Sequence, residues 1–290
     1  MGERQPMTVA FLGPLASFSH VASARFFEQE DVELLPHPTI PDCIEAVAKG
    51  EVTYALVPLE NALEGSVPLT IDYLFHGTRL YMTAEVLLPI EQHLLIHPEN
   101  KEALDQLESI QSHPHALAQC HQYLKESHAG VPLIQTTSTA RAAELVSAHP
   151  EQKIAAVGNK LAAKTYQLEV AKENIHDYHF NHTRFVVLSR QKEQFVYDDR
   201  RPTPKTTLMV KLPEDDRPGR LHQILSVFSW RRLNLSKIES RPMKTGLGHY
   251  FFIIDVMQDE REPMMQGAYE ELAALGCTIQ SFGTYYVYQK

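Results

Sequence analysis

The chain has 290 residues, 43% of them hydrophobic and 22% charged, which is typical of a globular protein with two or three domains and excludes a disordered or fibrous chain. A formal net charge of −9 without a basic stripe excludes a nucleic-acid-binding face. The sequence starts with no secretory leader pattern and has no apolar run near the roughly 18 residues of a membrane span, so we expect a cytoplasmic protein without membrane contact.

The three cysteines, Cys43, Cys120 and Cys277, lie far apart and form no C-x-x-C motif. This pattern supports neither a disulfide framework nor a zinc knuckle, and we expect three small buried side chains. The histidines between His113 and His121 lack a ligand spacing such as H-E-x-x-H, so no metal site is predicted there.

Strand and helix signals alternate along the first 61 residues. Breaks at Gly13-Pro14 and Gly50, and an N-cap signal at Ser17 or Ser19, separate the elements. They predict strands at 9–12, 32–35 and 54–57, with helices that begin near 17–19 and 41–42. This repetition indicates a parallel sheet with right-handed crossovers, in which the loops 13–19 and 60–61 face one crevice.

The segment 80–178 repeats the pattern and predicts a second α/β lobe. Its expected strands are 85–88, 93–96, 110–112, 131–135 and 154–157, and its expected helices are 100–107, 116–125, 140–147 and 159–166. The polar tetrad Asn181-His182-Thr183-Arg184 then runs into an apolar strand. We expect the strand 183–188 to return to the first lobe and to place these polar residues at a cleft between the lobes, where α/β proteins bind ligands.

The composition becomes polar at 191–204, where Pro202 and Pro204 indicate a linker. The elements expected after it follow the order βαββαβ of the ferredoxin-like fold. They lie at 206–212, 219–231, 235–241, 249–257, 263–275 and 277–288, with a turn at 244–248.

Five motifs follow one another along nearly the whole chain. They are Gly13-Pro14 with Ser17-Phe18-Ser19-His20, Pro58-Leu59-Glu60-Asn61, Ser112-His113 with Gln119-Cys120, Thr183-Arg184-Phe185, and Glu239-Ser240-Arg241-Pro242. In this order the chain resembles the monofunctional bacterial prephenate dehydratases, whose last motif belongs to a C-terminal ACT regulatory domain.

The resemblance implies a two-lobed α/β catalytic domain, similar to periplasmic binding proteins, and an α+β ferredoxin-like ACT domain. The catalytic domain would span 1–190, with one lobe at 1–79 and 180–190 and the other at 80–179. A linker at 191–204 and the ACT domain at 205–290 would follow.

The resemblance also implies a hydro-lyase that converts prephenate into phenylpyruvate in phenylalanine biosynthesis, without a metal or organic cofactor. Thr183 would donate a hydrogen bond to the departing hydroxyl, and Glu60 would supply a proton if burial raises its pKa. Groups expected to hold the substrate dianion are Ser17, Asn61, Ser112, Gln119, Arg184 and Phe185. The role of Arg184 is weaker, because alternation along a strand places it on the face opposite Thr183 and Phe185.

Likeness to ACT domains implies phenylalanine as an allosteric effector at the interface of a homodimer or homotetramer. The expected pocket residues are Gly219, Arg220, Leu221, His222, Glu239, Ser240, Arg241 and Pro242. Gly219 opens a helix whose N–H groups suit the carboxylate of an amino acid. A domain that only dimerises is the alternative, since exposed strand edges would suffice for that.

Two other functions remain open. Arogenate dehydratase differs only in an amino group on the substrate side chain. A non-catalytic amino-acid-binding sensor could combine a two-lobed fold with an ACT-like domain, but it would not need Thr183. A dehydrogenase is excluded, because the first strand is not followed by a G-x-G-x-x-G turn.

Overall fold

The structure is a computed structural model that describes residues 7–77, 79–195, 203–213, 218–243 and 250–290. The chain forms two compact units. Unit 1 comprises Met1–Ile71, Leu87–Phe185 and Lys290, and unit 2 comprises Asp72–Val86 and Val186–Gln289. The strands β5 (Tyr81–Pro89) and β11 (His182–Ser189) contribute residues to both units.

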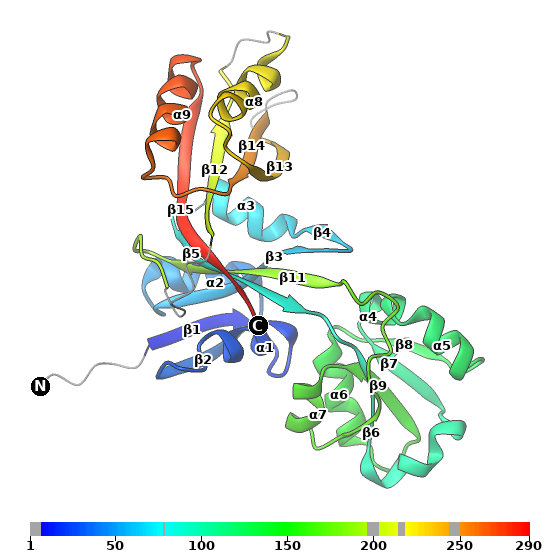
Figure 1. Cartoon of the computed structure of the whole chain (residues 1–290). Coiled ribbons are helices and arrows are strands. Elements are labelled where there is room, and N and C mark those ends of the chain that lie inside the picture. The colour runs from blue at the N-terminus through cyan, green and yellow to red at the C-terminus, as the bar shows by residue number, and fades with distance from the viewer. Residues whose placement is uncertain (1–6, 78, 196–202, 214–217, 244–249) are drawn as a thin grey trace, which may run out of the picture. The chain divides into compact units, whose positions relative to one another are not determined.

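The first part of unit 1 is a parallel sheet with connecting helices (Figure 1). Strand β1 (Met7–Leu12) pairs in parallel with β2 (Val32–His37) and β3 (Tyr54–Asn61), and β11 lies next to β3. Helices α1 (Phe18–Phe26) and α2 (Ile40–Lys49) connect the strands. The parallel sheet and the return of the chain to it through β11 are therefore confirmed.

Short-range signals explain where these helices begin and end. The Ser17 hydroxyl accepts a hydrogen bond from the His20 N–H, so Ser17 rather than Ser19 caps α1. Thr39 caps α2 by accepting from the Asp42 N–H. Gly50 ends α2 with a φ of 79°, a left-handed conformation that favours glycine.

Strand β3 extends beyond the expected turn at 58–61. It continues through Asn61 and pairs with the short strand β4 (Gly65–Ser66), with Asn61 opposite Gly65. The expectation that Glu60 and Asn61 lie in a loop is wrong, because this hairpin extends the strand past Pro58. The helix α3 (Pro68–His76) that follows was not predicted.

The second part of unit 1 is a five-stranded sheet in the order β10-β6-β9-β7-β8. Its strands are β6 (His93–Ile96), β7 (Ser109–Ser112), β8 (Leu133–Gln135), β9 (Ile154–Gly158) and β10 (Glu169–Lys172). Strand β7 is parallel to β8 and β9, whereas β6 is antiparallel to β9 and β10. The expected α/β lobe is confirmed, but β10 was missed, and the strand expected in this lobe at 85–88 lies instead in β5, which belongs to the other sheet.

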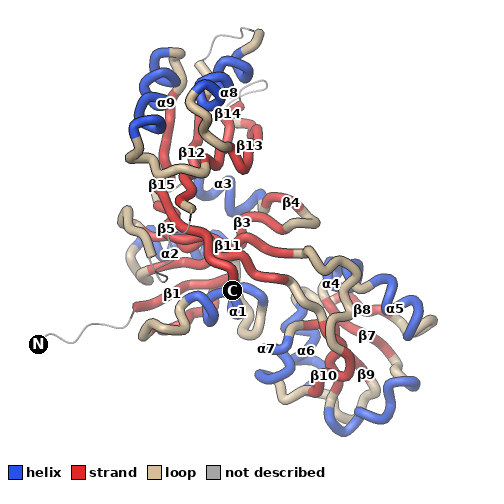
Figure 2. The backbone as a smooth tube through the Cα atoms, in the orientation of Figure 1, coloured by secondary structure: helices blue, strands red, loops and turns tan. Residues whose placement is uncertain are grey.

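Helices connect the strands of this second sheet (Figure 2). Their bounds differ from those expected. They are η1 (Pro98–Gln106), α4 (Pro114–Gln119), α5 (His121–Ser127), α6 (Thr139–Ala148) and α7 (Lys160–Thr165). The segment expected as the helix 100–107 is a 3₁₀ helix without buried residues. The expected helix 116–125 is divided at Cys120, where the backbone leaves the helical conformation.

The C-terminal part of unit 2 has the expected βαββαβ order. Its elements are β12 (Pro204–Lys211), α8 (Arg220–Trp230), β13 (Leu235–Pro242), β14 (Tyr250–Val256), α9 (Pro263–Ala274) and β15 (Thr278–Gln289). The sheet order is β13-β14-β12-β15, and every pair is antiparallel. Ile224 and Phe228 of α8 pack with Ile254 and Leu272 in its core. The ferredoxin-like expectation is confirmed, while the turn 244–248 lies outside the described residues.

Unit 2 also includes Asp72–Val86 from the middle of the chain. Phe75 of α3 packs against Phe251 and Phe282, with ring centroids 5.7 and 4.4 Å away. Strand β5 lies next to β15. This part of the chain is therefore built into the core of the unit that contains the C-terminal sheet.

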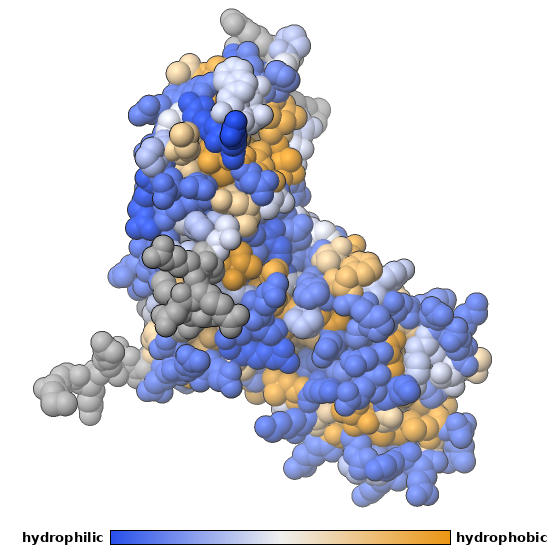
Figure 3. Space-filling view, in the orientation of Figure 1, coloured by the Kyte–Doolittle hydropathy of each residue, from blue (hydrophilic) through white to orange (hydrophobic). Residues whose placement is uncertain are grey.

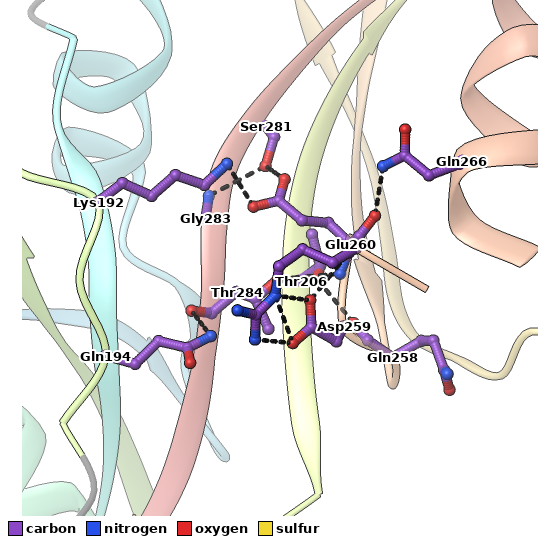
Figure 4. A network of polar contacts seen from close by, with 11 residues as sticks. Lys192, Gln194, Thr206, Gln258, Asp259, Glu260, Gln266, Ser281, Gly283 and Thr284 are labelled. Atoms are coloured by element: carbon purple, nitrogen blue, oxygen red, sulfur yellow. Dashed lines mark hydrogen bonds and ion pairs between the residues drawn. The ribbon is translucent and has the colours of Figure 1, made fainter. Parts of the chain in front are cut away.

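Polar side chains anchor residues 192–194, which fall in the segment expected as a linker (Figure 4). Lys192 forms an ion pair with Glu260 at 2.5 Å, and Ser281 donates to the other oxygen of that carboxylate at 2.6 Å. Gln194 donates to the Thr284 carbonyl at 2.9 Å. The start of the segment is thus held on β15 and the loop before α9, whereas 196–202 lie outside the described residues.

The visible surface is mostly hydrophilic (Figure 3), in keeping with the composition. Within the described ranges, no helix combines the length and the apolar character needed to cross a membrane. Cys43 and Cys120 are buried as expected, but Cys277 is only partly buried.

Candidate functional site

A cavity of about 1190 Å³ lies in unit 1, and residues from both of its sheets line it. The polar residues of its wall are Ser17, Ser19, His37, Asn61, Glu64, Ser66, Gln92, His113, His115, Gln119, Thr137, Ser138, Thr139, Arg141, Glu144 and Thr183. A cavity of this size, with many convergent polar groups, is typical of a ligand site.

Asn61 and Thr183 are joined in the cavity wall. The Asn61 amide Nδ2 donates to the Thr183 hydroxyl oxygen at 2.9 Å and to the Asn181 side-chain oxygen at 3.0 Å. Its Oδ1 accepts from the backbone N–H groups of Leu63 and Glu64. Because both ends of the amide are engaged, Asn61 fixes the Thr183 oxygen and leaves the hydroxyl hydrogen available to a ligand in the cavity.

A strained turn presents Ser17 to the same cavity. Ala16 is fully buried and has a φ of 63°, which is unfavourable for a residue with a Cβ atom. Its N–H donates to His20 Nδ1 at 2.9 Å, and its carbonyl accepts from Asn159 Nδ2 at 2.9 Å. Ser17 itself donates to the Leu12 carbonyl at 2.9 Å while it caps α1. These bonds hold the turn in place despite its strain.

The role of His20 in this turn predicts a pH-dependent stability. Burial lowers the pKa of His20, and its ring must stay neutral at Nδ1 to accept from the Ala16 N–H. Between this lowered value and the ordinary pKa of about 6.5, the unfolded chain binds more protons, so the free energy of unfolding falls as the pH falls through that window. A His20→Gln variant keeps an acceptor without titrating. We expect its urea midpoint to depend less on pH than that of the wild type; identical pH profiles would contradict this.

Glu60 and Arg184 do not belong to the cavity wall as the structure describes it. Arg184 Nη1 and Glu60 Oε2 form an ion pair at 2.5 Å. Both side chains sit on strands whose neighbouring residues, Asn61 and Thr183, face the cavity, so alternation turns them away. The structure therefore places neither Glu60, the expected proton source, nor Arg184, the expected carboxylate ligand, in the described cavity wall.

Some of the other expected substrate-binding residues line the cavity, and one does not. Gln119 and Phe185 line the cavity. Ser112 is fully buried, and its hydroxyl donates to the Val157 carbonyl at 2.6 Å instead of facing the cavity. Ser112 thus ties β7 to β9, and this geometry gives no support to its expected role in substrate binding.

The sequence reading missed several cavity residues. Thr137, Ser138 and Thr139 lie where α6 begins, and Ser138 accepts from the Arg141 N–H as its N-cap. A helix-start signal was present at these residues, but nothing in the sequence indicated that this helix faces the first sheet. For Gln92 and Glu144, no sequence motif indicated that they belong to a ligand site.

Comparison with known proteins identifies the family. Residues 9–193 match the prephenate dehydratase family, and residues 206–275 match the ACT domain. The chain belongs to the prephenate dehydratase family. The recognised family and the expected lyase class are both confirmed, as is the presence of an ACT domain.

Individual relatives agree with this assignment over nearly the whole chain. The prephenate dehydratase of Bacillus subtilis (strain 168) is 52% identical over 285 residues, which are 98% of this chain and 100% of that protein. A prephenate dehydratase structure from Arthrobacter aurescens, solved in complex with L-Phe, is 33% identical with a TM-score of 0.85 and covers 97% of this chain and 90% of its own. A structure described as the quorum quenching acylase GqqA is 26% identical with a TM-score of 0.82, covering 97% and 98%.

The expected effector residues of this prephenate dehydratase lie on two elements of unit 2. Gly219 precedes α8 with a φ of 86°, and Arg220, Leu221 and His222 form the first turn of that helix. The residues 239–242 lie on β13. Leu221 is 41% exposed, so an apolar surface is available beside the start of the helix.

Charged partners surround Arg241 on β13. Its guanidinium forms an ion pair with Asp72 at 3.0 Å, and a longer contact of 3.7 Å joins it to Glu239. Lys237 lies 3.2 Å from the same Glu239 carboxylate. This part of β13 is therefore held by a network of charges, all within unit 2.

Proposed function

We propose that this prephenate dehydratase binds prephenate in the cavity of unit 1 and converts it into phenylpyruvate, with phenylalanine as inhibitor at the ACT domain. We also propose that it does so in the cytoplasm, as a homodimer or homotetramer. The observation that carries the catalytic proposal is the Thr183 hydroxyl in the cavity wall, with its oxygen fixed by Asn61 at 2.9 Å.

The chemistry of prephenate defines what the cavity has to supply. When the ring carboxylate leaves as carbon dioxide, its electron pair enters the ring and expels the hydroxyl group on the opposite ring carbon. The dianion and one proton thus give the phenylpyruvate monoanion, carbon dioxide and water. Because aromatisation drives the reaction, the site needs a hydrogen-bond donor at the departing oxygen and donors for two carboxylates.

Thr183 is the proposed donor at the departing oxygen. An alcohol is a very weak acid, so it donates a hydrogen bond and water in the cavity supplies the net proton. Asn61 keeps the hydroxyl pointed by donating to its oxygen, which leaves the O–H bond directed away from the amide. In this proposal Asn61 acts as a positioning residue.

Arg141 is proposed to bind one substrate carboxylate. It is the only side chain in the described cavity wall with a permanent positive charge, and in this structure it lies 2.7 Å from Glu144, which also lines the cavity. We expect Arg141→Ala to raise the KM for prephenate by about 10-fold, since a charge-assisted hydrogen bond is lost at a partly exposed site. Glu144→Gln should lower the KM, because it releases Arg141 from its competitor.

Steady-state kinetics of both variants test this role. Arg25→Ala serves as the control, because Arg25 is an exposed arginine of unit 1 that does not line the cavity. An Arg141→Ala protein with the KM of the control would rule out the contact.

The regulatory part of the proposal is supported by the relative from Arthrobacter aurescens, which was solved with L-Phe bound. In this chain the first turn of α8 offers backbone N–H groups for a carboxylate, and Leu221 offers apolar contact. An inhibitor must bind one state of the protein more tightly than another, because equal affinity shifts no equilibrium.

One experiment separates the proposed function from its alternatives. Purified protein is assayed with prephenate and with arogenate, each with and without phenylalanine. We expect turnover of prephenate that phenylalanine reduces. Preference for arogenate would assign the arogenate dehydratase alternative, and binding of phenylalanine without turnover of either substrate would assign the sensor.

A further inference from the structure

Gln92 is a cavity residue with an unsatisfied polar atom. It lines the cavity of unit 1, and only 2% of its surface is exposed. Its side-chain oxygen Oε1 is buried and has no hydrogen-bond partner among the described residues. Because a buried amide oxygen without a partner is destabilising, its retention at a ligand cavity needs an explanation.

The backbone around Gln92 holds its side chain in place. Its N–H donates to His176 Nδ1 at 3.3 Å, and its carbonyl accepts from the Ile175 N–H at 2.9 Å. Asp177, which lies two residues after Ile175, donates its N–H to the Gln119 carbonyl at 2.7 Å. One short segment, 175–177, therefore positions both Gln92 and Gln119.

The two glutamines form an amide pair that can present either polarity to the cavity. Gln92 Nε2 donates to Gln119 Oε1 across 3.5 Å, which leaves Gln92 Oε1 unpartnered. Rotation of both amide groups by half a turn reverses the pair: Gln119 then donates to Gln92 Oε1, and the Gln92 NH₂ group takes the unpartnered position. An anionic ligand would select this second arrangement.

The charge of the cavity wall makes such neutral donors necessary. Its permanently charged side chains, among the residues described, are Arg141, Glu64 and Glu144, so the wall carries more negative than positive charge. Arg141 is moreover paired with Glu144. A substrate with two carboxylates must therefore obtain most of its hydrogen bonds from uncharged groups.

We propose that Gln92 binds the substrate: with Gln119 it forms an amide pair whose rotated state donates an N–H to a carboxylate of the dianion. This inference rests on the proposed function, since it takes prephenate as the ligand of the cavity. It assigns to Gln92 a role in substrate affinity, while the chemical step remains with Thr183.

Steady-state kinetics on three full-length variants test the proposal. Gln92→Met keeps the length of the side chain without its polar atoms, and Gln92→Glu keeps its shape but replaces the donor by a carboxylate. Gln122→Met is the control, because Gln122 is an exposed glutamine on α5. We expect the KM for prephenate to rise about 10- to 100-fold in Gln92→Met and further in Gln92→Glu, with kcat within a few-fold of the wild type in both. The melting temperature of Gln92→Met should be unchanged, whereas the buried carboxylate of Gln92→Glu should lower it.

The outcomes separate this inference from the proposed function. Wild-type activity with an unchanged KM in Gln92→Met overturns the inference alone. A wild-type protein that neither binds nor converts prephenate overturns both. If Gln92→Met fails to fold, the Gln92→Glu variant decides. Its KM for prephenate should be higher at neutral pH than at mildly acidic pH, because a protonated carboxyl can donate a hydrogen bond. If this KM changes with pH no more than that of the wild type, the proposal is overturned.

Discussion

Replacing Thr183 by alanine should lower kcat for prephenate by about 100- to 10,000-fold, the range expected when a positioned proton donor is lost. Thr183 is 8% exposed in the cavity wall, and Asn61 fixes its hydroxyl oxygen, so the hydroxyl is oriented to donate to a ligand in the cavity. Thr183→Ser keeps the hydroxyl and should retain most of the activity. Steady-state assays of the purified variants measure both effects.

A matched control separates the hydroxyl from the shape of the side chain. Thr183→Val preserves the β-branched shape and removes only the oxygen, so we expect it to resemble Thr183→Ala in kcat while keeping the melting temperature of the wild type more closely. If the serine, valine and alanine variants all had the kcat of the wild type, Thr183 would have no part in the mechanism. Loss of activity together with loss of folding in the valine variant would indicate a structural role instead.

Local signals predicted most of the fold because neighbouring residues determine the ends of these elements. Thr39 and Gly50 start and stop α2 through bonds and backbone angles within a few residues. The βαββαβ order could likewise be predicted, since alternating apolar residues and short turns mark each strand. Elements that depend on distant partners were missed: β10 exists through its pairing with β6, about 75 residues earlier in the chain.

The site was predictable only where a residue belonged to one of the recognised motifs. Thr183, Asn61, Ser17 and Gln119 reached the cavity as expected. Glu60 did not, because the strand containing it is four residues longer than expected and alternation turns its carboxylate toward Arg184. Residues contributed by the second sheet, such as Arg141, required knowledge of how two distant parts of unit 1 meet.

The buried ion pair of unit 2 should have the largest effect on stability. Lys205 Nζ lies 2.8 and 3.0 Å from the two oxygens of Glu85, and the side chains are only 8% and 1% exposed. Removing one partner leaves a buried charge without its counterion, which typically costs about 3–5 kcal/mol. We therefore expect Lys205→Met and Glu85→Leu each to lower the free energy of unfolding by an amount in that range, measured by urea denaturation.

The double variant shows whether the ion pair itself stabilises the fold or whether the two buried charges only compensate each other. When both charges are replaced, no unpaired group remains, so Lys205→Met combined with Glu85→Leu should recover most of the stability that either single variant loses. The exposed pair of Lys49 and Glu45 is the control, and Lys49→Met should leave the urea midpoint unchanged because solvent already screens that pair. Additive losses in the double variant would mean that Lys205 and Glu85 contribute through other neighbours, and that their 2.8 Å contact is not what stabilises this unit.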